Sequence, residues 1–158
     1  MPTPTYIPLA TLNLSTSTSE IVFSSIPATY RDLIVVFTGT GTISDNQRAR
    51  FNGNTGSNYS VVFARGNGST ATSSSSTDTQ FTFGEIDSSV VCTNIMQIFD
   101  YAQTDKHKTI LQRSNDTTNS VFMYAGRWAL TDAINTISIY PASGSYNIGA
   151  TCSLYGIA

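Results

Sequence analysis

The sequence predicts an all-β protein, an antiparallel jelly-roll-like β-sandwich of about ten strands, with a closed barrel as the second choice. Short apolar or alternating segments recur at a spacing of about 8–12 residues, separated by turn residues. No longer window shows the 3.6-residue period of an amphipathic helix, and only residues 129–133 suggest a single helical turn. A chain of 158 residues favours one domain, here residues 9–158, which can bury a core without disulfides or metals.

The first eight residues differ from the rest. Prolines at positions 2, 4 and 8 exclude a helix and disfavour a central strand. We therefore expect residues 1–8 to form an extended N-terminal arm that docks on a neighbouring subunit, with a disordered tail as the alternative. This segment has neither the basic nor the apolar region of a signal peptide. The sequence also contains no apolar run as long as a membrane span.

The remaining strands are predicted from alternating apolar and polar residues, or from short runs of β-branched and aromatic residues. Leu33–Phe37 is the most apolar run, and we expect it to be buried on both faces. Residues 66–79 have low complexity, with serine at every position from 73 to 76, and predict a long mobile surface loop. The predicted strands cover residues 9–14, 20–26, 33–37, 47–51, 59–64, 80–86, 94–101, 106–113, 121–130, 136–140 and 149–157.

The segment Arg50–Tyr59 predicts a shaped loop between two strands. Its Asn52-Gly53 pair is a strong turn signal, because both residues tolerate a positive φ. The run of small polar residues is longer than a two-residue hairpin needs. Functional side chains often lie on such loops, held by a rigid scaffold.

Composition limits the classes of partner. Charged residues make up 11% of the chain, against roughly 25% in an average soluble protein. The net charge of −2 gives no electrostatic reason to expect nucleic-acid or anionic-membrane binding. Cys92 and Cys152 lie in apolar, strand-like contexts without metal-ligand spacing. We expect two buried thiols, with a disulfide still open if their strands are neighbours.

The residues offer little catalytic chemistry. The single histidine, His107, stands between two lysines, which disfavours its protonated form and a role as the base of a nucleophile triad. No phosphate-binding loop is present. We therefore expect no enzymatic activity, no catalytic residues, no metal and no cofactor.

Carboxylates give one further candidate. Glu85 and Asp87 lie two residues apart on a predicted strand and so share a face, as a glycosidase pair or a Ca²⁺ site would require. Residues 44–46 add oxygen donors of the calcium type, without a defined ligand spacing. We favour a solvated strand edge, where charge prevents pairing with another strand.

Four segments, in order along the chain, together resemble a family of tailed-phage virion structural proteins that is common in phages of marine and freshwater bacteria, including cyanophages. They are IPATYRDL at 26–33, RFNGNTGSNY at 50–59, DYAQTDKHKT at 100–109 and SLYGI at 153–157. The resemblance spans most of the chain. It implies a virion protein, assembled in the host cytoplasm, and it supplies no catalytic residues.

The resemblance implies either a capsid decoration (cement) protein or a fibre module. We expect a decoration protein that binds the major capsid protein as a homotrimer. The alternative is a receptor- or glycan-binding module of a tail or head fibre, which exposed Tyr59 or Trp128 would favour. A carbohydrate-active enzyme is a distant third. Tyr59, Tyr146 and Tyr155 are the tyrosines expected to be exposed. The predicted subunit or capsid interface comprises Pro4, Tyr6, Ile7, Pro8, Tyr59 and Tyr155.

Three other residues have predicted architectural roles. Asp32 and Arg50 each lie beside a strand, where they can hydrogen-bond the backbone at a loop end. The Tyr30 hydroxyl is expected to tie the Pro27 turn to the sheet.

Overall fold

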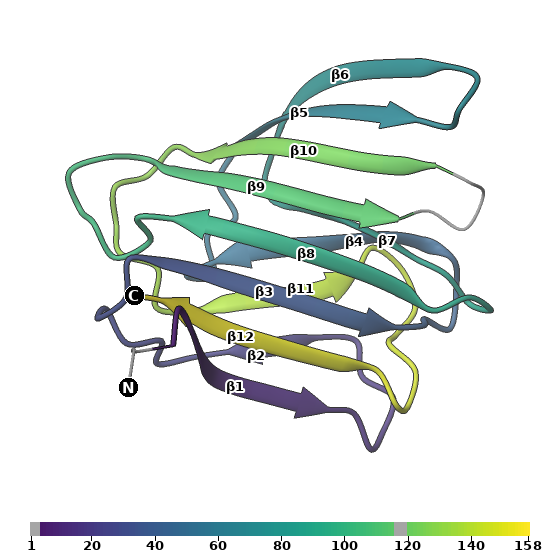
Figure 1. Cartoon of the computed structure of the whole chain (residues 1–158), viewed down its shortest axis with the longest axis horizontal. Helices are drawn as coiled ribbons and strands as arrows, with labels where there is room; N and C mark the ends of the chain where they lie inside the picture. The colour runs from purple at the N-terminus through teal and green to yellow at the C-terminus, as the bar shows by residue number, and fades with distance from the viewer. Residues whose placement is uncertain (1–3, 116–119) are drawn as a thin grey trace.

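The predicted fold class is confirmed. The computed structural model describes residues 4–115 and 120–158, and every regular element within them is a β-strand (Figure 1). The strands form two antiparallel sheets that pack face to face as a sandwich. They are β1 (Tyr6–Asn13), β2 (Ile21–Phe23), β3 (Asp32–Gly39), β4 (Asp45–Phe51), β5 (Tyr59–Gly66), β6 (Ala71–Asp78), β7 (Phe81–Ile86), β8 (Cys92–Phe99), β9 (Lys108–Asn115), β10 (Val121–Trp128), β11 (Ile137–Pro141) and β12 (Thr151–Ile157).

The two sheets differ in width. The large sheet has eight strands in the order β1-β12-β3-β8-β9-β10-β5-β6, and the small sheet has four in the order β2-β11-β4-β7. The first and last strands are neighbours, so Tyr6 and Ile157 lie side by side (Figure 1). Strand β7 packs against β8 and β9 of the large sheet. The last two strands of the large sheet, β5 and β6, extend beyond the edge of the small sheet (Figure 1).

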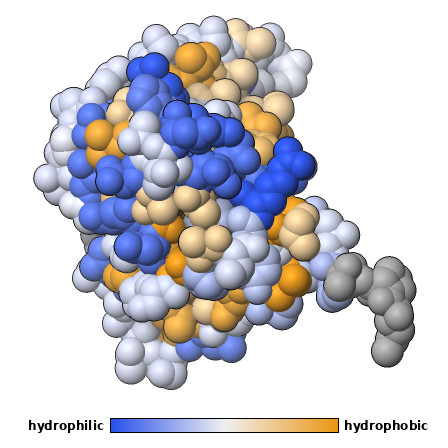
Figure 2. Space-filling view, turned by 90° about the vertical axis from the view of Figure 1, so that its left-hand side faces the viewer, coloured by the Kyte–Doolittle hydropathy of each residue, from blue (hydrophilic) through white to orange (hydrophobic). Residues whose placement is uncertain are grey.

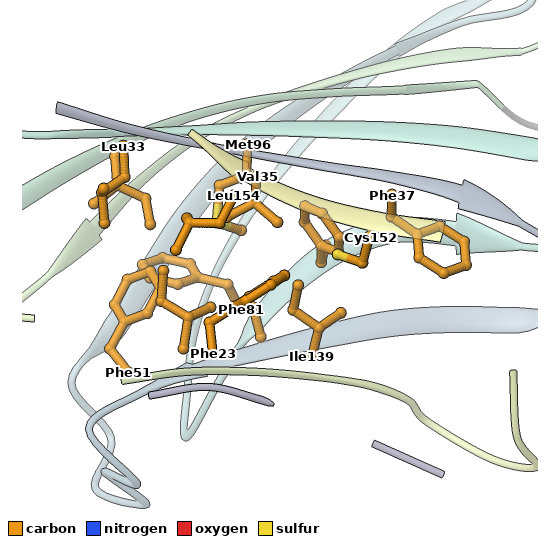
Figure 3. Close-up of a cluster of buried hydrophobic side chains, with 14 of the residues drawn as sticks. Phe23, Leu33, Val35, Phe37, Phe51, Phe81, Met96, Ile139, Cys152 and Leu154 are labelled. Atoms are coloured by element: carbon orange, nitrogen blue, oxygen red, sulfur yellow. The ribbon is translucent and has the colours of Figure 1, made fainter. Parts of the chain in front are cut away.

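A single apolar core fills the space between the sheets (Figure 3). Alternation along each strand directs every second side chain inward. Phe51, Tyr59, Phe81 and Trp128 form an aromatic cluster, in which the Phe51 and Trp128 rings meet edge to face at 5.7 Å. Burial raises the pKa of Tyr146, which has no exposed surface.

Three predictions about single segments are wrong. In β3, Leu33, Val35 and Phe37 are buried, whereas the intervening residues are only half-buried, because they point to the other face of the large sheet. Residues 71–78 form strand β6 instead of a mobile loop, since they pair in continuous register with β5. The single helical turn suggested for residues 129–133 is also absent.

The N-terminal strand begins inside the predicted arm. Tyr6 pairs with Ile157 and Pro8 with Tyr155, so residues 6–8 belong to β1. An edge strand tolerates Pro8, because a missing N–H on the free side breaks no ladder. Pro4 is exposed ahead of this strand, and residues 1–3 lie outside the described part of the chain.

The two cysteines are both free and both buried. Cys152 pairs with Phe37, and Cys92 with Gly39, so strand β3 separates them. Two strand spacings amount to roughly 9–10 Å, which is beyond the reach of a disulfide. Their strands are therefore not neighbours, and the open alternative of a disulfide is excluded in this structure.

The predicted backbone contacts of Asp32 and Arg50 are present. The Asp32 carboxylate accepts a hydrogen bond from the Asp100 N–H at 2.9 Å. The Arg50 Nε donates to the Thr79 carbonyl at 3.3 Å. Each side chain thus fastens a strand end to a neighbouring connection.

Tyr101, and not Tyr30, ties the Pro27 turn to the sheet. The buried Tyr101 hydroxyl donates to the Pro27 carbonyl and accepts from the Tyr30 N–H. We expect Tyr101→Phe to lower the free energy of unfolding by about 1–2 kcal/mol, because the hydrogen bonds of this hydroxyl to Pro27 and Tyr30 are lost. Tyr30→Phe is the matched control, with an expected change below about 0.5 kcal/mol. Urea denaturation measures both, and equal losses for the two variants would contradict this assignment.

Candidate interaction surface

The face of the large sheet that points away from the small sheet is the principal candidate site. We call it the outer face. It carries exposed apolar side chains on strands whose alternate residues are buried in the core. Met123 is 60% exposed, Val62 56% and Leu111 49%. The larger apolar side chains of this face include Tyr6, Ile34, Val36, Val62, Ile95, Phe99, Leu111, Val121, Met123, Tyr155 and Ile157.

Strand register gathers these side chains into rows across the sheet. Leu111 pairs with Gln97 on one side and Ala125 on the other, and Ala125 pairs with Val62. In the next row along the strands, Arg113 pairs with Ile95 on one side and with Met123 on the other. Directly opposite residues lie about 4.5–5.5 Å apart, so the apolar groups form a continuous surface.

Two hollows mark this surface. The smaller, about 230 Å³, lies over β8, β9 and β10, where Tyr6, Ile95, Leu111 and Met123 line it. The larger, about 680 Å³, is an open trough across β9, β10, β5 and β6. Small residues floor the trough, and it is lined by Ser60, Val61, Val62, Ser75, Ser76, Thr77, Thr109, Ala125, Gly126 and Arg127.

The charge on the outer face has one sign. In the described part of the large sheet, the exposed charged side chains that project from this face are Arg113 and Arg127. Asp78, on β6, pairs with the inward-facing Tyr59 and so points to the other side. The outer face is therefore basic, although the chain as a whole carries a net charge of −2.

The corresponding face of the small sheet is polar and internally hydrogen-bonded. Arg50 donates to the Gln80 side-chain oxygen at 2.8 Å and lies 5.2 Å from the centre of the Tyr140 ring. Tyr140 donates to the same oxygen at 2.8 Å, and Arg48 donates to Thr82 at 2.9 Å. Extensive apolar exposure is thus a feature of the outer face and not of both faces of the sandwich.

Connecting loops form a polar surface at one end of the sandwich. Figure 2 faces this end and shows hydrophilic side chains over its upper part, with apolar ones among them. Hydrogen bonds join the loops at 52–58, 100–107 and 129–136 here. The Asn52 side chain donates to the Ala133 carbonyl at 2.8 Å and accepts from the Asn135 N–H at 2.9 Å. Asn52 and Gly53 both have a positive φ, as the turn signal predicted. The Arg50–Tyr59 segment is therefore a braced β-connection.

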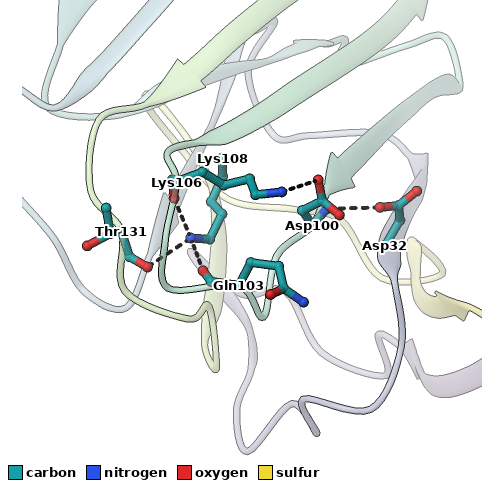
Figure 4. Close-up of polar contacts among 6 residues, drawn as sticks. All are labelled: Asp32, Asp100, Gln103, Lys106, Lys108 and Thr131. Carbon is teal, nitrogen blue, oxygen red and sulfur yellow. Dashed lines mark hydrogen bonds and ion pairs between the residues drawn. The ribbon is translucent and has the colours of Figure 1, made fainter.

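A buried lysine organises the neighbouring loops (Figure 4). Lys108 has no exposed surface, and its ammonium donates to the carbonyls of Gln103 at 2.5 Å, Thr131 at 3.0 Å and Lys106 at 3.1 Å. Burial lowers the pKa of this amine. His107, on the same loop, is exposed. The ammonium fixes loop geometry and uses all three of its donors to do so.

The carboxylates that the sequence singled out meet at the opposite end. Asp45, Glu85 and Asp87 line one small pocket with Ser44 and Asn46. The Asp87 carboxylate already accepts from the Ser89 N–H at 2.7 Å, the Val90 N–H at 2.9 Å and the Ser44 hydroxyl at 2.9 Å. These bonds hold its pKa well below the usual range. Asp87 thus caps a turn, and no His, Cys, Asp and Glu cluster in the described ranges is arranged to hold a metal ion.

The predicted interface residues divide into two groups. Tyr6, Pro8 and Tyr155 are brought together beside the outer face, and Ile7 is half-buried between them on the inward side. Tyr59 is wrong as an exposed contact residue, because it is 1% exposed and its hydroxyl donates to the Asn54 carbonyl. Tyr146 and Trp128 are buried as well, which removes the aromatic surface expected of a glycan site.

Sequence analysis missed the central residues of the outer face. Leu111, Val121 and Met123 lie on strands that were predicted correctly, but only one apolar face was considered for each. Apolar residues at both odd and even positions of β9 and β10 are the signal that could have revealed a second apolar face.

The described residues contain no helix long and apolar enough to cross a membrane.

Comparison with known proteins gives only distant likenesses. No family model and no curated protein matches the chain. Among solved structures, the chain is similar to a galectin of Caenorhabditis elegans, at 6% identity and a TM-score of 0.38, over 94% of this chain and 95% of that one. An alginate lyase in complex with alginate trisaccharide matches at 13% identity and a TM-score of 0.37, over 93% of this chain and 78% of that one.

Proposed function

We propose that the protein is a non-enzymatic structural component of a phage virion, a decoration protein that binds the major capsid protein through its outer face. The observation that carries this proposal is the apolar outer face itself. Exposed Leu111 and Val62 flank Ala125 in one row across three neighbouring strands, and exposed Met123 lies in the next row. Apolar surface of this extent on a folded domain is typical of a protein contact.

The size of the face suits such a contact. A sheet eight strands wide spans about 38 Å, and strands of eight residues are about 26 Å long. The resulting area of roughly 1,000 Å² compares with about 800 Å² per partner in a standard interface. Arg113 and Arg127 would favour a partner surface that carries carboxylates. Many identical contacts on a capsid add by multivalency, so that each contact can be modest.

Substitutions at the centre of the outer face test the proposal. We expect Leu111→Glu and Met123→Glu each to weaken binding to capsids of the encoding phage at least about tenfold, which corresponds to about 1.4 kcal/mol. The side chains are exposed, so the melting temperature should stay nearly unchanged. Co-sedimentation of purified protein with capsids measures the affinity.

The small sheet supplies the matched control. Val22 is 44% exposed on the opposite side of the sandwich, and Val22→Glu should leave capsid binding intact. Wild-type protein that fails to bind capsids would overturn the proposal. Equal loss of binding in all three variants would instead exclude the outer face as the contact surface.

A glycan-binding module of a fibre is the second candidate. The trough over β5, β6, β9 and β10 favours it, because Thr109, Arg127, Ser60 and Thr77 form one polar row across it. Such a set would suit an acidic sugar. A glycan array decides between the candidates, since binding that depends on Arg127 would support the fibre module.

A further inference from the structure

The two sheets have four edge strands, and the exposed edges are not equivalent. Strands β1 and β6 flank the large sheet, and β2 and β7 flank the small sheet. An edge strand presents unpaired N–H and C=O groups that can pair with another chain. Natural proteins block this pairing with proline, charge, bulges or very short edge strands.

Three of the edges carry such protection. Strand β1 contains Pro8 and an irregular register between Pro8 and Ala10. Strand β2 has only three residues. Strand β7 has an irregular register opposite β4 and includes Gly84 at φ 95°. Each of these features interrupts or shortens the row of groups available for pairing.

Strand β6 lacks all of these protections. It has eight residues, and its register with β5 runs without interruption from Ala71–Gly66 to Asp78–Tyr59. It contains no proline, and its only charged residue is the last, Asp78. All of its residues are exposed on both faces of the sheet. The sandwich thus leaves one long, regular edge open that is uncharged up to its last residue.

We propose that β6 is a self-association site, at which the β6 strands of two copies pair antiparallel across a two-fold axis. The two large sheets then join into one continuous sheet. The partner is a second copy of this chain because the edge is self-complementary. A two-fold interface requires the same surface on both subunits, and an antiparallel strand pair satisfies this requirement.

Two registers pair the greatest length of the eight-residue strand β6, because its midpoint lies between Ser74 and Ser75. A two-fold axis perpendicular to the sheet keeps the outer faces of both copies on the same side. Directly opposite residues must point to the same side of the sheet, so the residue at the axis pairs with the same residue of the other copy. Centred on Ser75, the pairing places Ser73 opposite Thr77 and Thr72 opposite Asp78; centred on Ser74, it places Ser73 opposite Ser75. Hydroxyl pairs on facing strands are favourable, and no like charges meet in either register.

The pairing is compatible with a trimer bound to a capsid. Each subunit has one free β6 edge, so two neighbouring trimers can join through it. Strand addition gains its affinity from backbone hydrogen bonds, and the high local concentration on a capsid surface strengthens it. The inference does not depend on capsid binding, because it concerns two copies of the chain alone.

A cysteine scan of the purified protein tests the proposal. Single variants Ser73→Cys, Ser74→Cys, Ser75→Cys and Ser76→Cys are oxidised mildly and separated on a non-reducing gel. Only a residue on the two-fold axis faces its own copy within disulfide range. We therefore expect one sharp maximum of dimer, at position 74 or 75, at least about tenfold above the other positions.

The chain provides its own controls. Both natural thiols have no exposed surface, and burial raises the pKa of Cys152 to about 12, so the wild type should not cross-link. Asn13→Cys, on the opposite edge strand β1, measures random collision. Equal yields along the scan, or no yield above that of Asn13→Cys, would overturn the proposal.

A charged variant supplies an independent measurement. Ser74→Lys/Ser75→Lys places an ammonium on the axis in either register, where the two copies repel each other. We expect self-association in sedimentation velocity to fall at least about tenfold, with an unchanged melting temperature, whereas Asn13→Lys should change neither. Self-association that survives the double lysine variant would also overturn the proposal. Loss of capsid binding in the outer-face variants, with β6 cross-linking intact, separates the two proposals.

Discussion

Replacing Lys108 with methionine should lower the free energy of unfolding by about 3–5 kcal/mol. The methionine side chain keeps the length and the apolar packing of the lysine stem, so the principal loss is the ammonium. That group donates to three carbonyls from two different loops (Figure 4). Hydrogen bonds to a charged group contribute about 1.5–3 kcal/mol each, and a buried carbonyl without a donor costs about 1–3 kcal/mol.

Guanidinium denaturation followed by tryptophan fluorescence measures this loss, because buried Trp128 ends the adjacent strand β10. The same substitution two residues earlier is the control. Lys106 has an exposed side chain and one ion pair, with Asp100 at 3.4 Å. Exposed ion pairs contribute about 0–1 kcal/mol, so Lys106→Met should change stability little. Similar losses for the two variants would show that the buried ammonium does not hold the loops.

Gly84→Ala should destabilise the fold by more than about 3 kcal/mol. Gly84 has φ 95°, a conformation that side chains of L-residues rarely adopt, at a cost of about 1–3 kcal/mol. A Cβ here would also lie 2.5 Å from Asn94 Oδ1 and 2.6 Å from Ser114 Cβ. Both neighbours are buried in the large sheet, so neither can move into solvent.

Gly53→Ala separates backbone strain from overlap. Gly53 also has a positive φ, of 64°, but a Cβ at this position would meet no atom within 4 Å. We expect a loss of about 1 kcal/mol, from strain alone. Thermal denaturation of the two variants gives the comparison. A Gly84→Ala variant as stable as Gly53→Ala would contradict the close packing of β7 against the large sheet.

Local patterns predicted most of the fold. Alternation identified strands such as Asn94–Tyr101 and Thr136–Tyr140 nearly at their observed positions, because a half-buried strand must alternate. The same reasoning failed for β6. Its serines lack an apolar face, and only pairing with β5, determined by the fold as a whole, makes the segment a strand. Strand order and the position of the ends are likewise set by packing that no local pattern encodes.

The candidate site was predicted less well than the fold. Tyr6 and Tyr155 were expected at an interface and do lie beside the outer face. Tyr59 was chosen because it borders a polar loop, but its large ring is more stable in the core, where its hydroxyl also finds partners. Leu111 and Met123 were missed because exposure is a property of the assembled sandwich. A sequence shows that a residue is apolar. It does not show which face of the large sheet the small sheet will cover.

We propose that the protein lies on the outside of a phage capsid, and its location in the particle is the measurement that decides this. A cryo-electron microscopy map of the encoding phage, at a resolution that orients the sandwich, provides the measurement. We expect the sandwich on the outer surface of the capsid, with Leu111, Met123 and Arg113 in contact with the major capsid protein. Density on the tail, or an outer face turned to solvent, would contradict it.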